Sequence, residues 1–458
     1  MISCPGCGQC LRFDPATQQM HCDYCDAGFD PYTFDVEKGD AKQAASFDTY
    51  VWVCPSCGGQ LETVDETDAM GFCPYCGGAS LLADRIRKRW RPKSVIPFSV
   101  TKEQCKAAYL TEAKKHWFVS KRYKDPALLE NFRGIYMPYW TYRLRHKGAY
   151  YIPAETAPKR EGESFFTRYY EIEGEMDLES DGYGHDASGA FDDRISQNLE
   201  PFHAEARMPF APGFLSGFYT IVGDQPRDKL DSWVEETAKQ DVLQKLIEPD
   251  TEVGLELRMK KLEPQLRRAY APAEIVEAER CLYPVWFMSY RQGDRLTYAA
   301  VNGQTGKVFA DFPASLPKVL GLGLALAALI FVLLLFGPAI HAGTAALISA
   351  GLFSAGLYFL EHAFNTLTDQ SRALLFARPS QRYLEKRTLR MACAVASVVG
   401  AVLLRIGCPT KTLPCSAFCM GLAALFCYFI FEYIQLQLAI ASRRPPHFNR
   451  KGAASDDK

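Results

Sequence analysis

The chain lacks the residue patterns of two common enzyme classes. The phosphate-binding pattern Gly-x4-Gly-Lys-Ser/Thr is absent, because the nearest string, at 303–308, has the wrong spacing and no hydroxyl for magnesium. The Gly-x-Ser-x-Gly nucleophile elbow is absent as well. These absences exclude a P-loop helicase and an α/β-hydrolase, and we expect a protein that is not an enzyme. The opening residues Met1–Cys4 also lack the features of a signal peptide.

Positive charge is scarce in the first 84 residues, where three basic residues face 13 acidic ones. A surface with that charge repels phosphate and loses the counterion release that dominates nonspecific nucleic-acid affinity. Nucleic-acid binding is therefore disfavoured. Only the segment 85–93, with six basic residues, indicates the opposite. We interpret it as a solvated hinge or as a contact for anionic lipid headgroups.

The same N-terminal region contains eight cysteines in four Cys-x-x-Cys pairs. The pairs combine two by two across spacers of 14 residues (8–21) and 15 residues (58–72). At such spacings two pairs close one tetrahedral Cys4 zinc site. The predicted ligands are Cys4, Cys7, Cys22 and Cys25 in the first site and Cys54, Cys57, Cys73 and Cys76 in the second.

Two other uses of Cys-x-x-Cys fit this sequence less well. A redox dithiol normally occurs once and within a βαβ pattern, and disulfides need an oxidising compartment. Segments this short cannot bury enough apolar surface to fold alone, and zinc supplies about 10–16 kcal/mol in isolated fingers. We therefore predict two structural zinc ribbons. Cys10 and His21 lie close enough in sequence to replace one ligand.

Apolar residues are concentrated after residue 315, although the mean hydropathy of the whole chain is only −0.14. Four runs, at about 320–336, 342–360, 391–407 and 416–440, predict a bundle of four transmembrane helices. Glu432, in the last run, is the one deeply placed carboxylate. We expect it to anchor the helix at the interface, with an ion or proton role as the alternative.

Basic residues predict the orientation of these helices. They are frequent in 361–390 and in the tail 441–458, whereas the two opposite loops offer only Arg405 and Lys411. The positive-inside rule then places both termini in the cytoplasm and the protein in the cell membrane as a multi-pass protein. Cys408 and Cys415 would lie on the outer side, where a disulfide could form.

The middle of the chain predicts an α+β fold. Thr101–Val119 has the pattern of an amphipathic helix with Thr101 as its N-cap, and a second helix is expected at Asp228–Ile247. Two strands, Ile135–Arg145 and Leu282–Tyr290, share a Pro-x-Trp spacing, so we predict an internal duplication. Proline inside them suggests sheet edges or bulges.

Three other segments of this region carry predictions. A Pro/Phe entry at Phe210–Phe214 precedes the second helix, 249–280 is expected to be a charged helical insertion, and Val301–Val308 a hairpin. The acidic segment 179–188 is expected to be a loop. It brings together His185, Asp186 and Ser188, which we interpret as a polar turn rather than a catalytic triad or a weak cation site, and His203 as a surface residue. Together these patterns divide the chain into the following domains: ribbon 1 (1–30), a linker (31–49), ribbon 2 (50–84), the hinge (85–93), a soluble α+β domain (94–313), a transmembrane region (316–440) and a basic tail (441–458).

The ribbons resemble those of a bacterial membrane-protein family with N-terminal transcription factor IIB-type zinc ribbons, whose members are often labelled primosomal protein N′/replication factor Y-like. The strings that carry the resemblance are Val95–Phe98, Gly134–Trp140, Tyr283–Trp286 and Val301–Val308. The resemblance implies zinc at the eight cysteines and membrane attachment, and transfers no activity. We expect a cytoplasmic-face protein-binding scaffold, for example in envelope organisation or stress response. A membrane-tethered nucleic-acid-binding regulator is the alternative, and a transporter or enzyme the third possibility.

Overall fold

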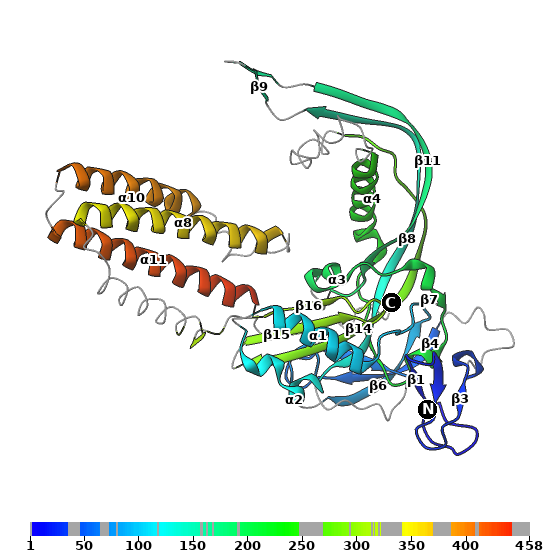
Figure 1. The fold of residues 1–458 in the computed structure, drawn as a ribbon. Helices are drawn as coiled ribbons and strands as arrows, with labels where there is room; N and C mark the ends of the chain where they lie inside the picture. The colour runs from blue at the N-terminus through cyan, green and yellow to red at the C-terminus, as the bar shows by residue number, and fades with distance from the viewer. Residues whose placement is uncertain are drawn as a thin grey trace.

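The structure, a computed structural model, divides the chain into three parts (Figure 1). The residues described are 2–34, 46–64, 73–78, 81–116, 119–155, 159–161, 164–166, 169–189, 193–246, 269–292, 295–312, 315, 317–318, 321, 341–369, 386–407 and 412–441. They form a Cys-rich N-terminal region, a sheet-rich soluble domain and three long apolar helices. The chain is therefore multidomain, as predicted.

An 11-stranded sheet organises the soluble domain. Eight strands follow the order β12-β7-β14-β8-β13-β5-β4-β6, while β11 pairs with β8, β15 with β14, and β16 with β15. The strands are β4 (Ser46–Val53), β5 (Gln60–Thr63), β6 (Leu82–Trp90), β7 (Ser94–Val95), β8 (Arg133–Glu155), β11 (Tyr169–Asp186), β12 (Met208–Pro209), β13 (Tyr219–Ile221), β14 (Glu274–Gln292), β15 (Arg295–Asn302) and β16 (Val308–Ala310). A small hairpin, β9 (Lys159–Glu161) with β10 (Ser164–Phe166), lies apart from this sheet.

Short helices accompany the sheet. They are α1 (Lys102–Lys115), α2 (Pro126–Leu129), α3 (Asp193–Leu199), α4 (Asp231–Leu246) and the 3-10 helices η1 (Pro31–Phe34), η2 (Lys121–Lys124), η3 (Ala204–Ala206), η4 (Pro212–Leu215) and η5 (Arg227–Lys229). Thr101 caps α1 as predicted, within a capping box completed by Gln104. The helix ends at Lys115, earlier than predicted, because His116 adopts an extended conformation.

The two Pro-x-Trp strands pair with each other at the centre of the sheet. In the antiparallel register of β8 and β14, Pro138 lies opposite Leu282 and Pro284 lies opposite Tyr136. These two pairs are related by a local twofold operation, because adding 146 to Pro138 gives Pro284 and adding 146 to Tyr136 gives Leu282. The pairing supports the predicted duplication.

The duplicated unit consists of a short strand, a helix, a long strand and the strand that pairs with it. The first copy is β7-α1-β8-β11 and the second is β13-α4-β14-β15. The copies exchange their first strands, since β7 runs parallel to β14 and β13 runs parallel to β8. The predicted Pro/Phe entry of the second copy was wrong: Pro212–Leu215 forms η4, and β13 is the counterpart of β7.

Matching side-chain bonds relate the two copies. The indole Nε1 of Trp140 donates to the carbonyl of Gln225 at 3.1 Å, and that of Trp286 donates to the carbonyl of Val100 at 2.8 Å. With β7 aligned on β13, Gln225 is the counterpart of Val100. The tryptophans therefore perform the same task in both copies: each ties its long strand to the segment that leads into the helix.

The strand prolines lie inside the sheet, so the prediction of an edge was wrong. The carbonyl of Pro138 accepts from the N–H of Ala187, and that of Pro284 accepts from Gly303, each at 2.8 Å. The nitrogen and carbonyl of one strand residue point the same way. Each proline nitrogen therefore faces a gap where the neighbouring strand changes, and no ladder bond is lost.

Three predicted segments have a different structure. The basic segment expected to be a hinge is mostly strand β6, which pairs with β4 from Ser46 to Val53. The acidic segment 179–188 is not a loop, because residues up to Asp186 belong to β11. The end of the predicted insertion 249–280 is strand as well, since β14 begins at Glu274; residues 249–268 lie outside the described part. The hairpin at 301–308 is confirmed, with Gly306 at φ 76°.

The three apolar helices are α8 (Ala342–Asp369), α10 (Arg387–Gly407) and α11 (Thr412–Ala441). Each contains a stretch of 21 to 23 residues that is long and apolar enough to cross a bilayer. They indicate membrane association. The predicted span at 320–336 and Cys408 lie outside the described residues, so four spans and a disulfide with Cys415 stay predictions.

Candidate metal centres

All four Cys-x-x-Cys turns have the same backbone geometry. In the first, the N–H of Gly8 donates to the carbonyl of Cys4 at 2.9 Å, and the equivalent bonds from Asp26, Gly58 and Gly77 measure 3.0, 2.8 and 2.8 Å. Closing the turn this way requires positive φ, which is 76°, 61°, 79° and 67° at the four donors. Glycine adopts it without strain, which explains three of the four donors. The fourth, Asp26, belongs to a residue type that tolerates it.

The turns bring eight thiols together as two groups of four, and all eight predicted ligands are in them. In each group the ligand atoms lie within 4.8 Å of one another. The closest sulfurs are 3.4 and 3.5 Å apart in the first group and 3.5 and 3.7 Å apart in the second. A tetrahedral ZnS4 unit with 2.3 Å bonds has sulfurs about 3.8 Å apart. Both groups could therefore hold a metal ion with little rearrangement.

The electrostatics favour anionic sulfur, which is the form that binds metal. Backbone N–H groups of Cys25 and Tyr24 lower the pKa of the Cys22 thiol to about 6. In the second group, hydrogen bonding from Cys57 lowers the pKa of Cys76 to about 2. One thiol in each group is thus prepared to ionise.

The first centre lies in a three-stranded sheet of β1 (Arg12–Asp14), β2 (Gln19–His21) and β3 (Gly28–Phe29). This sheet packs on the soluble domain, because the ring of Phe13 meets Phe214 edge-on at 5.2 Å and its N–H donates to the carbonyl of Ser216 at 3.1 Å. Its cysteines differ in exposure: Cys4 is buried and Cys25 is exposed. The first centre is accessible from solvent.

The second centre is built into the main sheet. Its strands β4 and β5 continue the sheet beyond β13, and its four cysteines are all buried. The hydroxyl of Tyr298 donates to the carbonyl of Tyr75 at 2.7 Å, and that of Ser289 donates to Cys73 at 3.4 Å. The second ribbon therefore shares its core with the α+β fold, and the prediction of a separate module at 50–84 missed this.

The other candidate residues have structural roles. Cys10 and His21 lie outside the two groups, and His21 contacts Asp26 at 3.1 Å. The carboxylate of Asp186 accepts from the hydroxyl of Ser196 at 2.5 Å.

No triad forms, because the His185 ring contacts the backbone carbonyl of Asp186 at 2.8 Å rather than its carboxylate. The N–H of Ser188 donates to that carboxylate at 3.3 Å. His203 is exposed.

Sequence reasoning missed an acidic face on β11. Figure 1 shows β8 and β11 continuing together as a long curved arm beside α4. Alternate residues of β11 are acidic and exposed, namely Glu171, Glu173, Glu175, Asp177, Glu179 and Asp181. Three basic residues of β8 face the last three of them, while the first three face Pro153, Tyr151 and Ala149. The strict alternation in 171–181 was the signal that could have identified this strand and its face.

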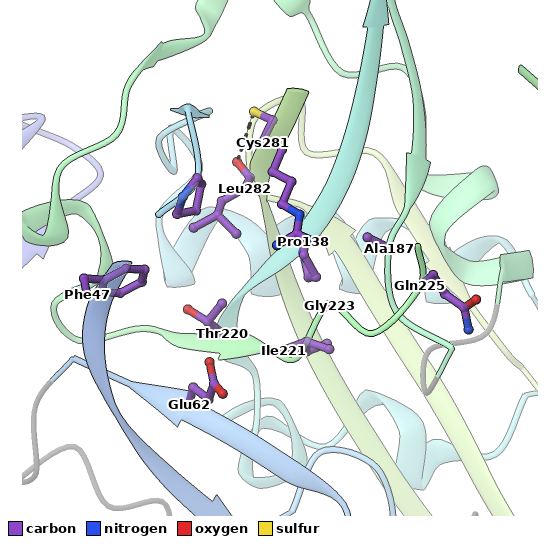
Figure 2. Close-up of a pocket in the computed structure, with 12 residues that line it drawn as sticks. Phe47, Glu62, Pro138, Ala187, Thr220, Ile221, Gly223, Gln225, Cys281 and Leu282 are labelled. Atoms are coloured by element: carbon purple, nitrogen blue, oxygen red, sulfur yellow. Dashed lines mark hydrogen bonds between the residues drawn. The ribbon is translucent and has the colours of Figure 1, made fainter. Parts of the chain in front are cut away.

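A pocket of about 70 Å³ lies where β4 and β5 meet the duplicated unit (Figure 2). It is lined by Phe47, Glu62, Pro92, Pro138, Ala187, Thr220, Ile221, Gly223, Gln225, Arg280, Cys281 and Leu282. The alignment of the copies explains it. At the corresponding gap beside Pro284, the buried ring of Phe98 fills the space, and the counterpart of Phe98 is Gly223. The pocket is the place where a phenylalanine ring is missing.

Charged residues gather at one end of the apolar helices. Lys386 is bonded to Glu432, whose carboxylate also accepts from the Tyr428 hydroxyl at 2.8 Å. Arg390 is bonded to Glu361 at 2.5 Å, and its side chain is only 1% exposed. Glu432 thus has its partners at one end of the bundle. The pair of Glu361 and Arg390 was missed, because attention went to the apolar runs and not to the residues at their ends.

The fold and the two centres define a class of protein: a membrane-associated, sheet-rich protein with two cysteine tetrads able to hold metal ions. The chain is similar to "Uncharacterized protein YdjG" of Bacillus subtilis (strain 168), with 25% identity over 327 residues, which cover 69% of this chain and 91% of that protein. No family model matches the chain, and no solved structure matches it. The predicted resemblance to zinc-ribbon membrane proteins is thus supported by the two cysteine groups, while the family itself stays a prediction.

Proposed function

We propose that the protein is a membrane-anchored scaffold whose two zinc ribbons and α+β domain recognise a protein partner at the cytoplasmic face. Zinc suits the four-sulfur groups, because they offer four thiols and no open position for a substrate. The spans at 320–336 and in α8, α10 and α11 would anchor the chain, with both termini in the cytoplasm.

The observation that carries the proposal is the pocket beside the second centre. It is small and mostly apolar, and the equivalent space in the other copy is filled by Phe98. A hydrophobic side chain from a partner would fill it in the same way. Such an anchor residue in a pocket is what concentrates binding energy at protein interfaces.

Surface charge supports a protein partner over nucleic acid. The β11 face carries six exposed acidic residues, and Asp23 and Asp26 are exposed beside the first centre. Acidic surfaces of this kind repel phosphate and attract basic polypeptide segments. The membrane-tethered nucleic-acid regulator remains the alternative, based on the basic residues of 85–93.

The test uses the full chain in lipid nanodiscs, because the second ribbon shares its core with residues far along the sequence. Partners would be captured by cross-linking from membranes with the wild type, Gly223→Phe and a control, Gly351→Phe. The Gly223 backbone has no positive φ, and an added Cβ would lie 3.1 Å from Pro138, so a small shift accommodates the ring. Nothing lies within 4 Å of a Cβ at Gly351.

We expect the wild type and Gly351→Phe to capture the same protein and Gly223→Phe to lose it. Capture that is unchanged in Gly223→Phe would exclude the pocket. Micromolar binding of DNA or RNA that weakens steeply with salt would refute protein recognition in favour of the alternative.

A further inference from the structure

A groove of about 430 Å³ lies between the helices α8 and α10. From α8 it is lined by Ser354, Leu357, Tyr358, Glu361 and His362, and from α10 by Arg387, Arg390, Met391, Ala394 and Val395. Within each helix these residues recur at intervals of three and four, so one face of each helix forms one wall. The groove therefore follows the seam between the two helices.

Polarity changes along this groove. Glu361, His362, Arg387 and Arg390 lie at one end, while the residues farther along are mainly apolar. The charged end coincides with the ends of the apolar stretches Ala342–His362 and Arg387–Gly407. In a bilayer those stretch ends lie at the level of the lipid headgroups. The eight residues after Arg387 add about 12 Å of apolar slot directed into the hydrocarbon.

The charged end has an excess of positive charge. Arg390 is buried and pairs with Glu361 at 2.5 Å, whereas Arg387 lies 4.0 Å from the same carboxylate and half of its side chain is exposed. Lys386 is engaged by Glu432. Two guanidinium groups thus share one carboxylate. One negative charge beside Arg387 would complete the balance, and a guanidinium suits the two oxygens of a phosphate.

We propose that the groove binds one anionic phospholipid. Its phosphate would contact Arg387, and one acyl chain would lie in the slot between Leu357 and Val395. The single net positive charge matches one phosphodiester, and the apolar slot matches an acyl chain. A free phosphate would use only the charged end, and a zwitterionic lipid would bring a second, repelled cation.

The test measures lipid retention by native mass spectrometry on the full chain purified in mild detergent. The protein is incubated with phosphatidylglycerol, with phosphatidylcholine of the same acyl chains, or with inorganic phosphate as a competitor. Two variants probe the two ends of the site: Arg387→Gln removes the phosphate contact, and Val395→Trp fills the slot. Each has a control on the same helix, Arg405→Gln at the opposite end and Val399→Trp one turn away and outside the groove lining.

We expect the wild type to retain one phosphatidylglycerol, and inorganic phosphate not to displace it. Arg387→Gln should weaken retention about tenfold, the usual loss for one charge-assisted hydrogen bond. Val395→Trp should abolish it, and both controls should behave as the wild type. Equal retention of phosphatidylcholine, an equal loss in Arg405→Gln, retention by Val395→Trp or displacement by inorganic phosphate would each overturn the proposal.

Discussion

Replacing Cys73 with serine is expected to unfold the soluble domain, whereas replacing Cys25 should disturb only the first centre. Cys73 is fully buried, and its carbonyl accepts the Ser289 hydroxyl of β14. Loss of one ligand there leaves anionic sulfurs in a dry core, and such uncompensated buried charge costs about 3–5 kcal/mol. That is a large share of the roughly 5–15 kcal/mol by which domains are stable.

At the first centre the expected effect is smaller. Cys25 is exposed, so a water molecule can occupy the position that its sulfur leaves, as it does at open zinc sites. The sheet β1-β2-β3 also keeps its contacts with the soluble domain through Phe13. We expect Cys25→Ser to fold normally and to release one zinc ion rapidly to a chelator.

The assay combines zinc content by elemental analysis with thermal unfolding of the full chain in nanodiscs, followed by near-UV circular dichroism. Cys73→Ser should lose its tertiary signal or melt far below the wild type, and Cys25→Ser should melt close to it. Equal destabilisation by the two substitutions would refute the conclusion that only the second centre is part of the core.

Three further substitutions test other parts of the fold. Gly134→Ala would place a Cβ 2.2 Å from the ring of Phe218, and such overpacking should destabilise the soluble domain by about 1–3 kcal/mol in chemical denaturation. Thr101→Ala removes the capping box of α1 and should cost about 1 kcal/mol by the same measurement, and an unchanged midpoint would contradict the cap. Glu361→Gln leaves the guanidinium of Arg390 buried without its carboxylate, so the helices should lose about 3–5 kcal/mol in detergent-induced unfolding. The double variant with Arg390→Met should recover most of that loss, whereas additive losses would exclude the pair.

Local patterns predicted the parts of this fold that depend on neighbours in sequence. The cysteine spacing identified both tetrads, because two turns and a short loop suffice to close each group. Thr101 and Gln104 identified a helix start, and Gly306 a hairpin. The repeat Pro-x-Trp at residues 138 and 284 indicated the duplication, since each tryptophan makes the same bond to the segment before a helix.

The features that escaped prediction depend on pairing between distant segments. Nothing in 85–93 indicates that it pairs with β4, because the basic residues resemble those of a solvated linker. Pro138 suggested an edge, and only the exchange of first strands between the copies reveals the gap that its nitrogen faces. The pocket at Gly223 required the alignment of β7 with β13, which is a property of the folded sheet.

The most direct test of the central claim is zinc X-ray absorption spectroscopy on the purified full chain, together with its zinc content. Two metal-binding tetrads within one folded domain predict two zinc ions per chain, each surrounded by four sulfur atoms at about 2.3 Å. Fewer than two ions per chain, nitrogen or oxygen ligands in either site, or disulfide-bonded tetrads would contradict it.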